Sequence, residues 1–350
     1  MDELQLYSPD ELKQQYPLTE NAIACIRSAR ETALAILSGH DERLLLIVGP
    51  CSIHNTEAAL EYAQRLMRLA EEVKDTFFVV MRTFFEKPRT SVGWKGLAYD
   101  PHLNGSCDIA AGLALCRSLL VALNTLGLPC ATEFLHPLIA PYFSDCISWG
   151  SIGARTCQSP IHREFVSGLK MPIGFKNRTD GDIDVAIQGI RLSSLPQRFL
   201  SVNSQGRIVQ KKSAGNPLPH LVLRGGSGQE NYHPAAIQHA THLLTQYNLP
   251  PALIVDCSHD NCRRNYQRQE HVFGSLMRQV QEGNRSIRGL MLESFLLNGT
   301  QDMLKMQLPP EQEAAIAFGG SLTDPCLGWE ATEDLIMSYA NFSIRGVWGA

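Results

Sequence analysis

The sequence predicts an α/β protein, a (β/α)8 TIM barrel with a helical extension at its N-terminus and an inserted β-hairpin. Three observations lead to this prediction. The chain has 350 residues, enough for one barrel of about 250 residues with additions. Eight short apolar runs of strand length alternate with longer amphipathic stretches. Each run ends at or near a side chain that can ionise or bind a metal.

The first 40 residues predict helices. Ser8, followed by Pro9 and Glu11, has the pattern of a capping box, in which a hydroxyl and a carboxylate satisfy free backbone amides. Thr19 can cap a second helix, which has apolar residues at helical spacing and ends at Gly39. We therefore expect residues 1–40 to form an extension for oligomerisation or regulation, and residues 41–350 to form the catalytic barrel.

The predicted barrel strands begin at residue 44. They are Leu44–Val48, Phe77–Met81, Cys130–Phe134, Ser151–Ala154, Pro172–Phe175, His220–Leu223, Ala252–Val255 and Gly289–Leu292. Helical stretches separate most of them, for example 56–73, 110–126 and 235–247. A further apolar run at 199–202, followed by polar sequence with a glycine, predicts the inserted hairpin at about 198–218. A doubly wound open sheet is the alternative, but Gly49-Pro50-Cys51 lacks the glycine-rich turn expected after its first strand.

Composition excludes several classes of protein. Lys and Arg number 31 and Asp and Glu number 35, so the formal net charge is −4, without the basic excess of a nucleic-acid-binding protein. No apolar run approaches the roughly 20 residues that cross a bilayer, and the N-terminus lacks the apolar stretch of a signal peptide. Ten cysteines are too few for a disulfide framework. We expect a soluble, cytoplasmic protein that binds neither nucleic acid nor a membrane.

Cations gather where the predicted strands end. They lie at strand ends or in the loop after the second strand, and they are Arg82, Lys87, Arg89, Arg155, Lys176 and Arg224. Thr90 adds a hydroxyl group next to Arg89. Barrel enzymes place their active sites at the carboxyl ends of the strands. Arg and Lys are costly to bury unpaired, and a guanidinium group suits phosphate and carboxylate oxygens. The sequence therefore predicts a small ligand with more than one phosphate or carboxylate group.

A second group of residues has the chemistry of metal ligands. It consists of Cys51, His259 and Glu293 at strand ends, and Asp324 further along the chain. One thiolate, one imidazole and two carboxylates suit one divalent Mn, Fe, Co or Zn ion better than Mg or Ca. A buried inert cysteine beside a hydrogen-bonded histidine is the alternative, and spacing alone leaves both open. Asp256, three residues before His259, is placed to orient that imidazole.

Several motifs together resemble those of the type I 3-deoxy-D-arabino-heptulosonate 7-phosphate (DAHP) synthases. They are GPCSIH at 49–54, MRTFFEKPRTSVGWKG at 81–96, IGART at 152–156, GFKNRTDG at 174–181, LRGG at 223–226, DCSHDN at 256–261, LES at 292–294 and SLTDPCLGW at 321–329. The resemblance implies a metal-dependent condensation of phosphoenolpyruvate with erythrose 4-phosphate and water. The products would be DAHP and phosphate, at the first step of the shikimate pathway to chorismate and the aromatic amino acids.

The resemblance also implies a role for each site residue. The metal ligands would be Cys51, His259, Glu293 and Asp324. The residues that hold phosphoenolpyruvate would be Arg82, Arg155, Lys176 and Arg224, and those that meet erythrose 4-phosphate would be Lys87, Arg89 and Thr90. Glu133 would position the attacking water. The residues taking part directly in catalysis would be Lys87, Glu133, His259 and Asp324.

Feedback control by an aromatic amino acid is a further implication of the resemblance. Phe199 and Ser201 match the family's inhibitor site, whereas Lys170 stands where a small polar residue is usual, so the effector stays open. A homodimer or homotetramer is expected, as in the family. Two other functions are alternatives. A related 3-deoxy-octulosonate 8-phosphate synthase would lack the long KPRTSVGWKG block, and a non-catalytic anion-binding barrel would not need all four metal ligands.

Overall fold

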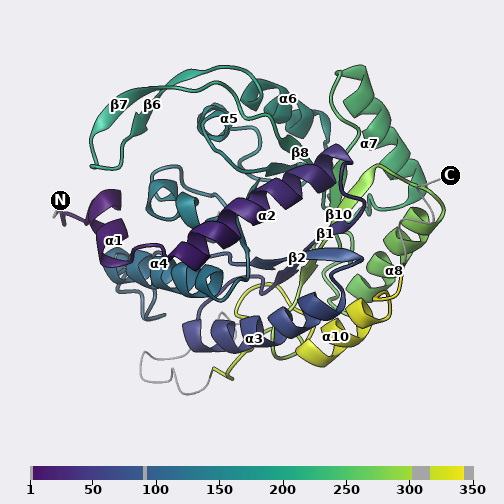
Figure 1. Ribbon diagram of the computed structural model, residues 1–350, viewed down its shortest axis with the longest axis horizontal. Helices are drawn as coiled ribbons and strands as arrows, with labels where there is room; N and C mark the ends of the chain where they lie inside the picture. Colours follow the sequence, from purple (N-terminus) through teal and green to yellow (C-terminus); the bar gives the residue numbers. More distant parts are fainter. Residues whose placement is uncertain (1–2, 90–92, 302–315, 343–350) are drawn as a thin grey trace.

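Eight parallel strands form a closed barrel in the computed structural model, which describes residues 3–89, 93–301 and 316–342 (Figure 1). Around the barrel the strands follow the order β1-β10-β9-β8-β5-β4-β3-β2. Their bounds are β1 Leu44–Gly49, β2 Phe77–Arg82, β3 Cys130–Glu133, β4 Trp149–Ile152, β5 Ile173–Lys176, β8 Pro219–Leu223, β9 Leu253–Asp256 and β10 Ile287–Glu293. The predicted (β/α)8 class is confirmed.

The fourth barrel strand, β4, begins two residues before its predicted start at Ser151. Trp149 pairs with Ala131 of β3, and Gly150 pairs with Ile173 of β5. A tryptophan beside a glycine is not by itself a strand signal, so the sequence pattern missed these two positions. Burial explains why these two residues join the strand, because Trp149 is fully buried in the same apolar cluster as residues of six other barrel strands.

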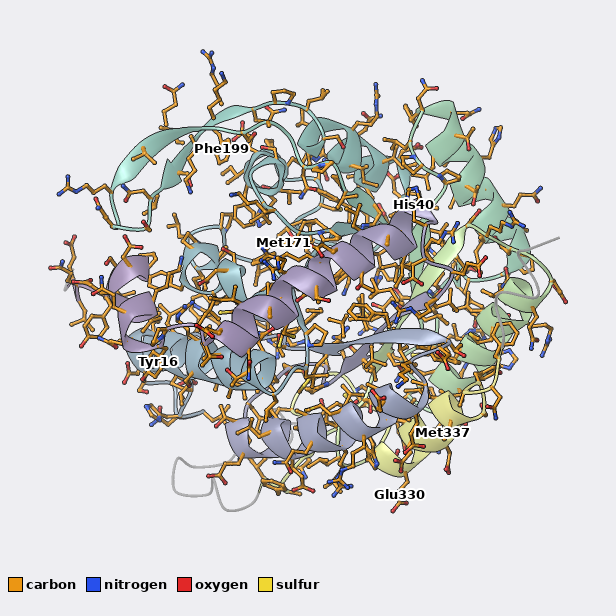
Figure 2. All side chains as sticks on the ribbon, in the orientation of Figure 1. Tyr16, His40, Met171, Phe199, Glu330 and Met337 are labelled. Carbon is orange, nitrogen blue, oxygen red and sulfur yellow. The ribbon has the colours of Figure 1, made fainter. Side chains whose placement is uncertain are left out.

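Helices cover the outside of the barrel. They are α3 Thr56–Glu72, α4 Ile109–Thr125, α5 Pro160–Ser167, α6 Asp184–Ser193, α7 Pro234–Gln246, α8 Arg268–Gln281 and α10 Trp329–Met337, with two short 3-10 turns, η1 Ala140–Tyr142 and η2 Ser144–Cys146. The three helices predicted at 56–73, 110–126 and 235–247 are α3, α4 and α7, within one residue at each end. All side chains are drawn together in Figure 2.

The two predicted N-terminal helices are present. Ser8 caps α1 (Pro9–Gln15) through the expected capping box, in which Glu11 Oε2 accepts a hydrogen bond from Ser8 N at 2.6 Å. Thr19 caps α2 (Glu20–Ser38), which ends at Gly39 with φ of 80°. Helix α2 crosses the barrel in Figure 1, and its Ile36 and Leu37 join the apolar cluster inside the barrel. This helix therefore closes the amino-terminal end of the barrel.

The predicted insertion is a two-stranded antiparallel hairpin, β6 (Arg198–Val202) and β7 (Ile208–Lys212), separate from the barrel sheet. It lies at the edge of the molecule in Figure 1, and Figure 2 labels Phe199 on its first strand. The backbone amide of Asp10 donates to Ser204 O at 2.8 Å, so the hairpin loop contacts α1. In the part of the chain that the structure describes, no helix is long and apolar enough to cross a membrane.

Candidate active site

A cavity of about 650 Å³ opens at the carboxyl ends of the barrel strands. Four predicted site residues, Arg82, Glu133, Lys176 and Glu293, are the last residues of their strands. Four others follow a strand within three residues, and these are Cys51, Arg155, Arg224 and His259. The cavity is lined by every predicted metal and substrate residue except Cys51, which lies buried beside Asp324, and Thr90, which is outside the described residues.

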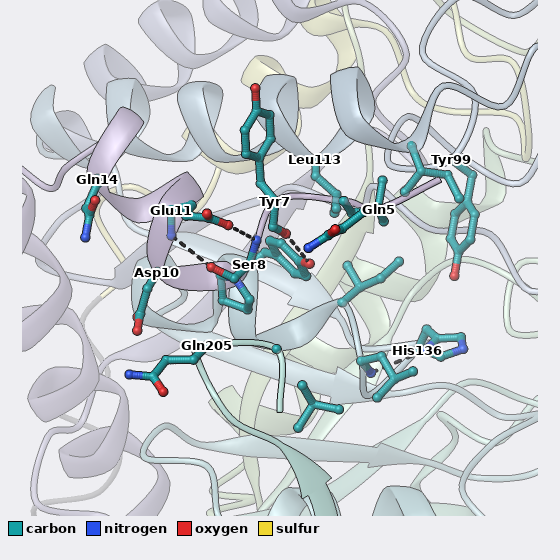
Figure 3. A pocket seen from close by; sticks show the side chains of 18 residues that line it. Gln5, Tyr7, Ser8, Asp10, Glu11, Gln14, Tyr99, Leu113, His136 and Gln205 are labelled. Carbon is teal, nitrogen blue, oxygen red and sulfur yellow. Dashed lines mark hydrogen bonds between the residues drawn. The ribbon is translucent and has the colours of Figure 1, made fainter. Parts of the chain in front are cut away.

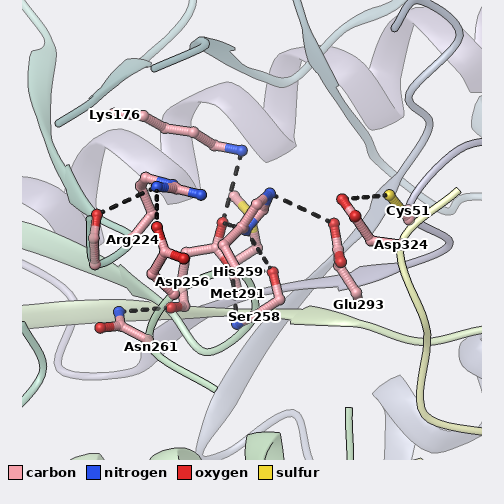
Figure 4. A network of polar contacts seen from close by, with 12 residues as sticks. Cys51, Lys176, Arg224, Asp256, Ser258, His259, Asn261, Met291, Glu293 and Asp324 are labelled. Atoms are coloured by element: carbon pink, nitrogen blue, oxygen red, sulfur yellow. Dashed lines mark hydrogen bonds and ion pairs between the residues drawn. The ribbon is translucent and has the colours of Figure 1, made fainter. Parts of the chain in front are cut away.

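Three of the four predicted metal ligands converge. The ligand atoms of Cys51, Glu293 and Asp324 all lie within 4.8 Å of one another. The Cys51 thiol donates to Asp324 Oδ2 at 3.5 Å, as Figure 4 shows. The fourth residue, His259, stands beside this group, with Nε2 3.8 Å from Glu293 Oε1. The structure therefore brings one sulfur, one nitrogen and two carboxylates to one place, a donor set suited to a borderline divalent ion.

Two buried groups orient the imidazole of His259. Its Nδ1 lies 3.0 Å from Asp256 Oδ2 and 2.7 Å from Ser258 Oγ. Burial pushes the pKa of Asp256 upward, but the nearby His259, Lys176 and Arg82 hold it well below its usual value. Ser258 Oγ donates to Asp256 Oδ1 at 2.6 Å, so it accepts from the protonated Nδ1 of His259, which leaves Nε2 free to bind a cation. The sequence spacing predicts this placement of Asp256 beside the imidazole.

The thiol of Cys51 lies between a cation and two carboxylates. Lys87 Nζ donates to Cys51 O at 2.6 Å and lies 3.0 Å from Cys51 Sγ. Burial, followed by the charge of Glu293, raises the pKa of the Cys51 thiol well above its usual value, and Lys87 acts in the opposite direction. Burial likewise pushes the pKa of Asp324 upward, but His259 and Lys87 hold it below its usual value. A divalent cation among these groups would replace the thiol proton and compensate the carboxylates.

The buried cations of the cavity are paired with carboxylates. Arg82 Nη2 lies 3.0 Å from Glu293 Oε1, and its guanidinium group stacks 4.0 Å from the ring of Phe84. Lys176 Nζ lies 3.0 Å from Glu133 Oε2 and 3.6 Å from Asp256 Oδ2. Burial pushes the pKa of Glu133 upward, but Lys176 holds it below its usual value, so this carboxylate is ionised at neutral pH.

The outer cations of the cavity are more accessible. Arg155 and Arg89 are exposed, and Arg89 Nε donates to Trp94 O at 2.8 Å. Arg224 is buried and pairs with Asp260 Oδ2 at 2.9 Å. Among the described residues, Arg155 has no carboxylate within ion-pair distance. These positions leave guanidinium groups available to an anionic ligand at the cavity walls.

The predicted effector residues lie apart from this cavity. Phe199 is buried with its ring beside Gly168, which follows α5, and Lys170 lies exposed two residues further on. Ser201 is half-buried on β6, and its Oγ donates to Val202 O at 3.4 Å. A larger cavity, of about 860 Å³, lies between residues 5–11, the start of α4, η1 and the hairpin loop (Figure 3). Lys170, Phe199 and Ser201 are outside its lining.

Sequence analysis missed several residues of the site. Arg264 lines the cavity and Asp260 pairs with Arg224, but neither is placed there by a strand end. Both belong to the loop after β9, where His259, Arg263 and Arg264 have positive φ of 57°, 52° and 57°. Positive φ in non-glycine residues is not signalled by composition or periodicity. The available signal is the pair of consecutive arginines after the DCSHDN motif.

Comparison with known proteins decides the family. Residues 15–337 match the DAHP synthetase I family. The chain belongs to this family. The Tyr-sensitive phospho-2-dehydro-3-deoxyheptonate aldolase of Escherichia coli (strain K12) is 46% identical over 335 residues, which cover 96% of this chain and 92% of that protein. The Trp-sensitive protein of the same organism is 45% identical over 336 residues, which cover 96% and 94% of the two chains.

A solved structure agrees with this assignment. The phospho-2-dehydro-3-deoxyheptonate aldolase from Francisella tularensis SCHU S4 superposes with a TM-score of 0.93 at 36% identity, covering 99% of each chain. The family that the motifs resemble is therefore confirmed, and with it the prediction that the chain is a DAHP synthase.

Proposed function

We propose that this DAHP synthase condenses phosphoenolpyruvate with erythrose 4-phosphate and water in a metal-dependent reaction that gives DAHP and phosphate. Membership of the family supports the condensation and its place in aromatic biosynthesis. One observation carries the metal dependence. A thiol, an imidazole and two carboxylates meet at a cavity whose walls carry cations.

One divalent Mn, Fe, Co or Zn ion fits this donor set, held by Cys51, His259, Glu293 and Asp324. Such an ion, when bound, acts as a Lewis acid on the aldehyde of erythrose 4-phosphate. Asp256 and Ser258 hold the imidazole in one orientation. Lys87, beside Cys51, would hold a proton near the aldehyde oxygen, because its ammonium group faces the same corner of the cavity.

The cationic walls suit the two phosphorylated substrates. Arg82, Arg155, Lys176 and Arg224 would hold the carboxylate and phosphate of phosphoenolpyruvate, while Lys87, Arg89 and Thr90 would contact erythrose 4-phosphate. Aligning two reactants in this way can lower the activation barrier by roughly 7–11 kcal/mol. Glu133 is ionised and faces the cavity, so it would accept a hydrogen bond from the water that attacks the enol carbon.

Phosphate release from phosphoenolpyruvate tests the proposal. Purified protein is assayed with erythrose 4-phosphate, with and without a chelator, and Mn, Fe, Co or Zn is then added back. We expect release that depends on both substrates, is lost with the chelator and returns with metal. Full activity in chelated buffer would contradict the metal dependence. A preference for arabinose 5-phosphate over erythrose 4-phosphate would favour the octulosonate synthase alternative.

We also propose that an aromatic amino acid regulates the enzyme. Two relatives are named Tyr-sensitive and Trp-sensitive, and Phe199, Ser201 and Lys170 are the residues proposed for the effector site. Residues 1–40 would contribute to regulation or to a homodimer or homotetramer. Calorimetry with phenylalanine, tyrosine and tryptophan is expected to show binding of at least one. Absence of heat from all three would contradict this part of the proposal, and sedimentation velocity measures the assembly.

A further inference from the structure

A second cavity, of about 580 Å³, adjoins the catalytic one. We call it the outer cavity, and its lining consists of Arg155, Thr179, Arg224, Ser227, Gly228, Asp260, Arg263 and Arg264. Four of these residues, Arg155, Thr179, Arg224 and Arg264, also line the catalytic cavity. In contrast, Lys87 and Arg89 line only the catalytic cavity. A phosphate group held by Arg155 and Arg224 would therefore border the outer cavity.

Positive charge dominates the outer cavity. Four of its lining residues are arginines and one, Asp260, is a carboxylate. Asp260 pairs with Arg224 at 2.9 Å and lies 3.9 Å from Arg264 Nε. The Arg263 and Arg264 side chains are 61% and 72% exposed. Arg263 Nε lies 2.8 Å from Glu230 Oε1, a carboxylate that also pairs with Arg268 and His233. One lining carboxylate cannot compensate four guanidinium groups, so the cavity favours an anion.

Hydrogen bonds from three asparagine side chains to the backbone hold the walls of the outer cavity in place. Asn177 Oδ1 accepts from Arg224 N at 2.8 Å, and Asn177 Nδ2 donates to Gly225 O at 2.9 Å. Asn231 Oδ1 accepts from Gly225 N at 2.7 Å, and Asn231 N donates to Asn261 Oδ1 at 2.8 Å. These bonds join the loops that follow β5, β8 and β9. The arginines therefore extend from a backbone that is already fixed before a ligand arrives.

The same loops carry unusual backbone conformations. Seven described non-glycine residues have positive φ, and four of them are Ser227, His259, Arg263 and Arg264. Such conformations cost free energy and persist where the surrounding structure enforces them, often at ligand sites. Gly226 is equally constrained, because a Cβ there would lie 2.1 Å from Gly181 N. Strain concentrated around one arginine-lined cavity indicates a binding function rather than a chance surface hollow.

We propose that the outer cavity is a phosphate-binding subsite through which inorganic phosphate leaves the catalytic cavity. The proposal rests on the proposed function in one respect, that phosphate is a product of the reaction. After its release between Arg155 and Arg224, phosphate moves outward to Arg263 and Arg264 and then to solvent. It does so without passing Lys87 and Arg89, where the sugar phosphate would be held.

The double variant Arg263→Gln/Arg264→Gln tests the subsite without any turnover. Inorganic phosphate is titrated calorimetrically into the metal-loaded protein, with no other substrate present. The variant is expected to bind one phosphate fewer than the wild type. The matched control is Arg68→Gln/Arg207→Gln, which removes two exposed arginines outside both cavities and keeps the wild-type stoichiometry. Equal stoichiometry in the cavity variant and the wild type would overturn the subsite, whatever the outcome of the activity assay.

A kinetic experiment tests the exit route. The inhibition constant of inorganic phosphate as a product is expected to rise about tenfold in the variant, as when a charge-assisted hydrogen bond is lost. In the variant, the release of phosphate, followed with a phosphate sensor, is expected to lag behind the formation of DAHP, measured by rapid quench. An unchanged inhibition constant together with a raised KM for phosphoenolpyruvate would overturn the route, because the arginines would then act on substrate binding. If the double variant fails to fold, Arg263→Gln, which alters a residue of the outer cavity alone, is measured in its place.

Discussion

At its amino-terminal end the barrel is closed by apolar side chains, with Ile36 and Leu37 of α2 packed in one cluster with interior residues such as Trp149. At its carboxyl-terminal end the same strands stop at Arg82, Glu133, Lys176 and Glu293. The first end buries apolar surface, which stabilises the fold at about 25 cal/mol per Å². The second end buries charges, which are costly unless paired. The same strands thus carry an apolar core at one end and the proposed ligand-binding residues at the other.

The pairing at the carboxyl-terminal end shows how those charges are tolerated. Arg82 is matched by Glu293, and Lys176 by Glu133 and Asp256. Replacing such pairs by apolar residues is often neutral or stabilising in proteins. Their presence therefore supports the proposed roles of these residues in substrate and metal binding. Substitutions at the two ends are expected to separate activity from stability accordingly.

The largest expected effect is on activity. Cys51→Ala removes a proposed metal ligand and is expected to lower metal-dependent turnover on the order of a thousandfold, since the electrostatic stabilisation supplied by the ion is lost. Because Cys51 is fully buried, the metal-free variant is also expected to lose about 1–2 kcal/mol of stability. Cys116→Ala, at a buried position on α4, is the matched control. It is expected to cost about 1–2 kcal/mol of stability and to leave turnover intact.

Both variants are measured by phosphate release and by urea unfolding. Equal loss of activity in Cys51→Ala and Cys116→Ala would contradict the division of roles between the two thiols. Restored turnover of Cys51→Ala at high metal concentration would still agree with it, since a missing ligand weakens metal binding.

The second prediction concerns the buried charges of the cavity. Lys176→Met leaves Glu133 and Asp256 without their shared ammonium group, and breaking a buried pair in this way costs about 3–5 kcal/mol. We expect a lower urea midpoint at pH 7 and partial recovery in the double variant Lys176→Met/Glu133→Gln. Without Lys176, burial is opposed only by Lys87 and His259, so the pKa of Glu133 is expected to rise relative to the wild type. The carboxyl then protonates more readily in the folded state, so the deficit should shrink as the pH falls toward 4.

Urea unfolding at pH 7 and pH 4 measures this effect. The loss of stability in Lys176→Met could be equal at both pH values, or the added Glu133→Gln change could fail to reduce it. Either result would show that the loss comes from missing packing of the lysine side chain and not from the unpaired carboxylate.

Most of the residues at the carboxyl-terminal end of the barrel can be predicted from the sequence. Apolar runs such as Phe77–Met81 indicate strands. The ionisable or metal-binding residue at or near the end of each run marks the carboxyl-terminal end of the barrel, because parallel strands of a barrel all end on one side. The convergence of Cys51, Glu293 and Asp324 follows once the barrel is assumed. The individual contacts within the site cannot be predicted in this way. The contact between Lys87 and Cys51, for example, depends on the path of the loop that carries Lys87.

The outer cavity and the amino-terminal end show why the rest escapes prediction. Arg263 and Arg264 reach their positions through left-handed backbone conformations, which no periodicity signals. Trp149 enters the barrel as a strand residue because burial of its ring outweighs the turn preference of the adjacent glycine. The partner of its indole, His220, lies on β8, 71 residues away in sequence. Tertiary contacts of this kind have no local signature.

The smallest expected effect is a dependence of stability on pH at the amino-terminal end. Trp149 Nε1 donates to His220 Nε2 at 3.1 Å, so Nε2 must be unprotonated and the proton lies on Nδ1, 3.1 Å from Leu218 O. Burial lowers the pKa of His220 to about 4, below its unfolded value. Between pH 4 and 6.5 the unfolded chain therefore binds more protons, and stability is lost as the pH falls. From pH 7.5 to pH 5 this amounts to about 2 kcal/mol.

His220→Gln isolates this contribution, because the glutamine oxygen can accept from Trp149 without titrating in this range. Burial also lowers the pKa of His54 to about 4, so the wild-type slope contains both histidines and the difference between the two proteins isolates His220. Urea unfolding at pH 7.5 and pH 5 is expected to show a shallower decline in the variant, with turnover at pH 7.5 unchanged. Parallel declines would mean that His220 is not held neutral by its surroundings. Reduced turnover would mean that the two ends of the barrel are coupled, because a change near the start of β8 would then reach the site at the ends of the strands.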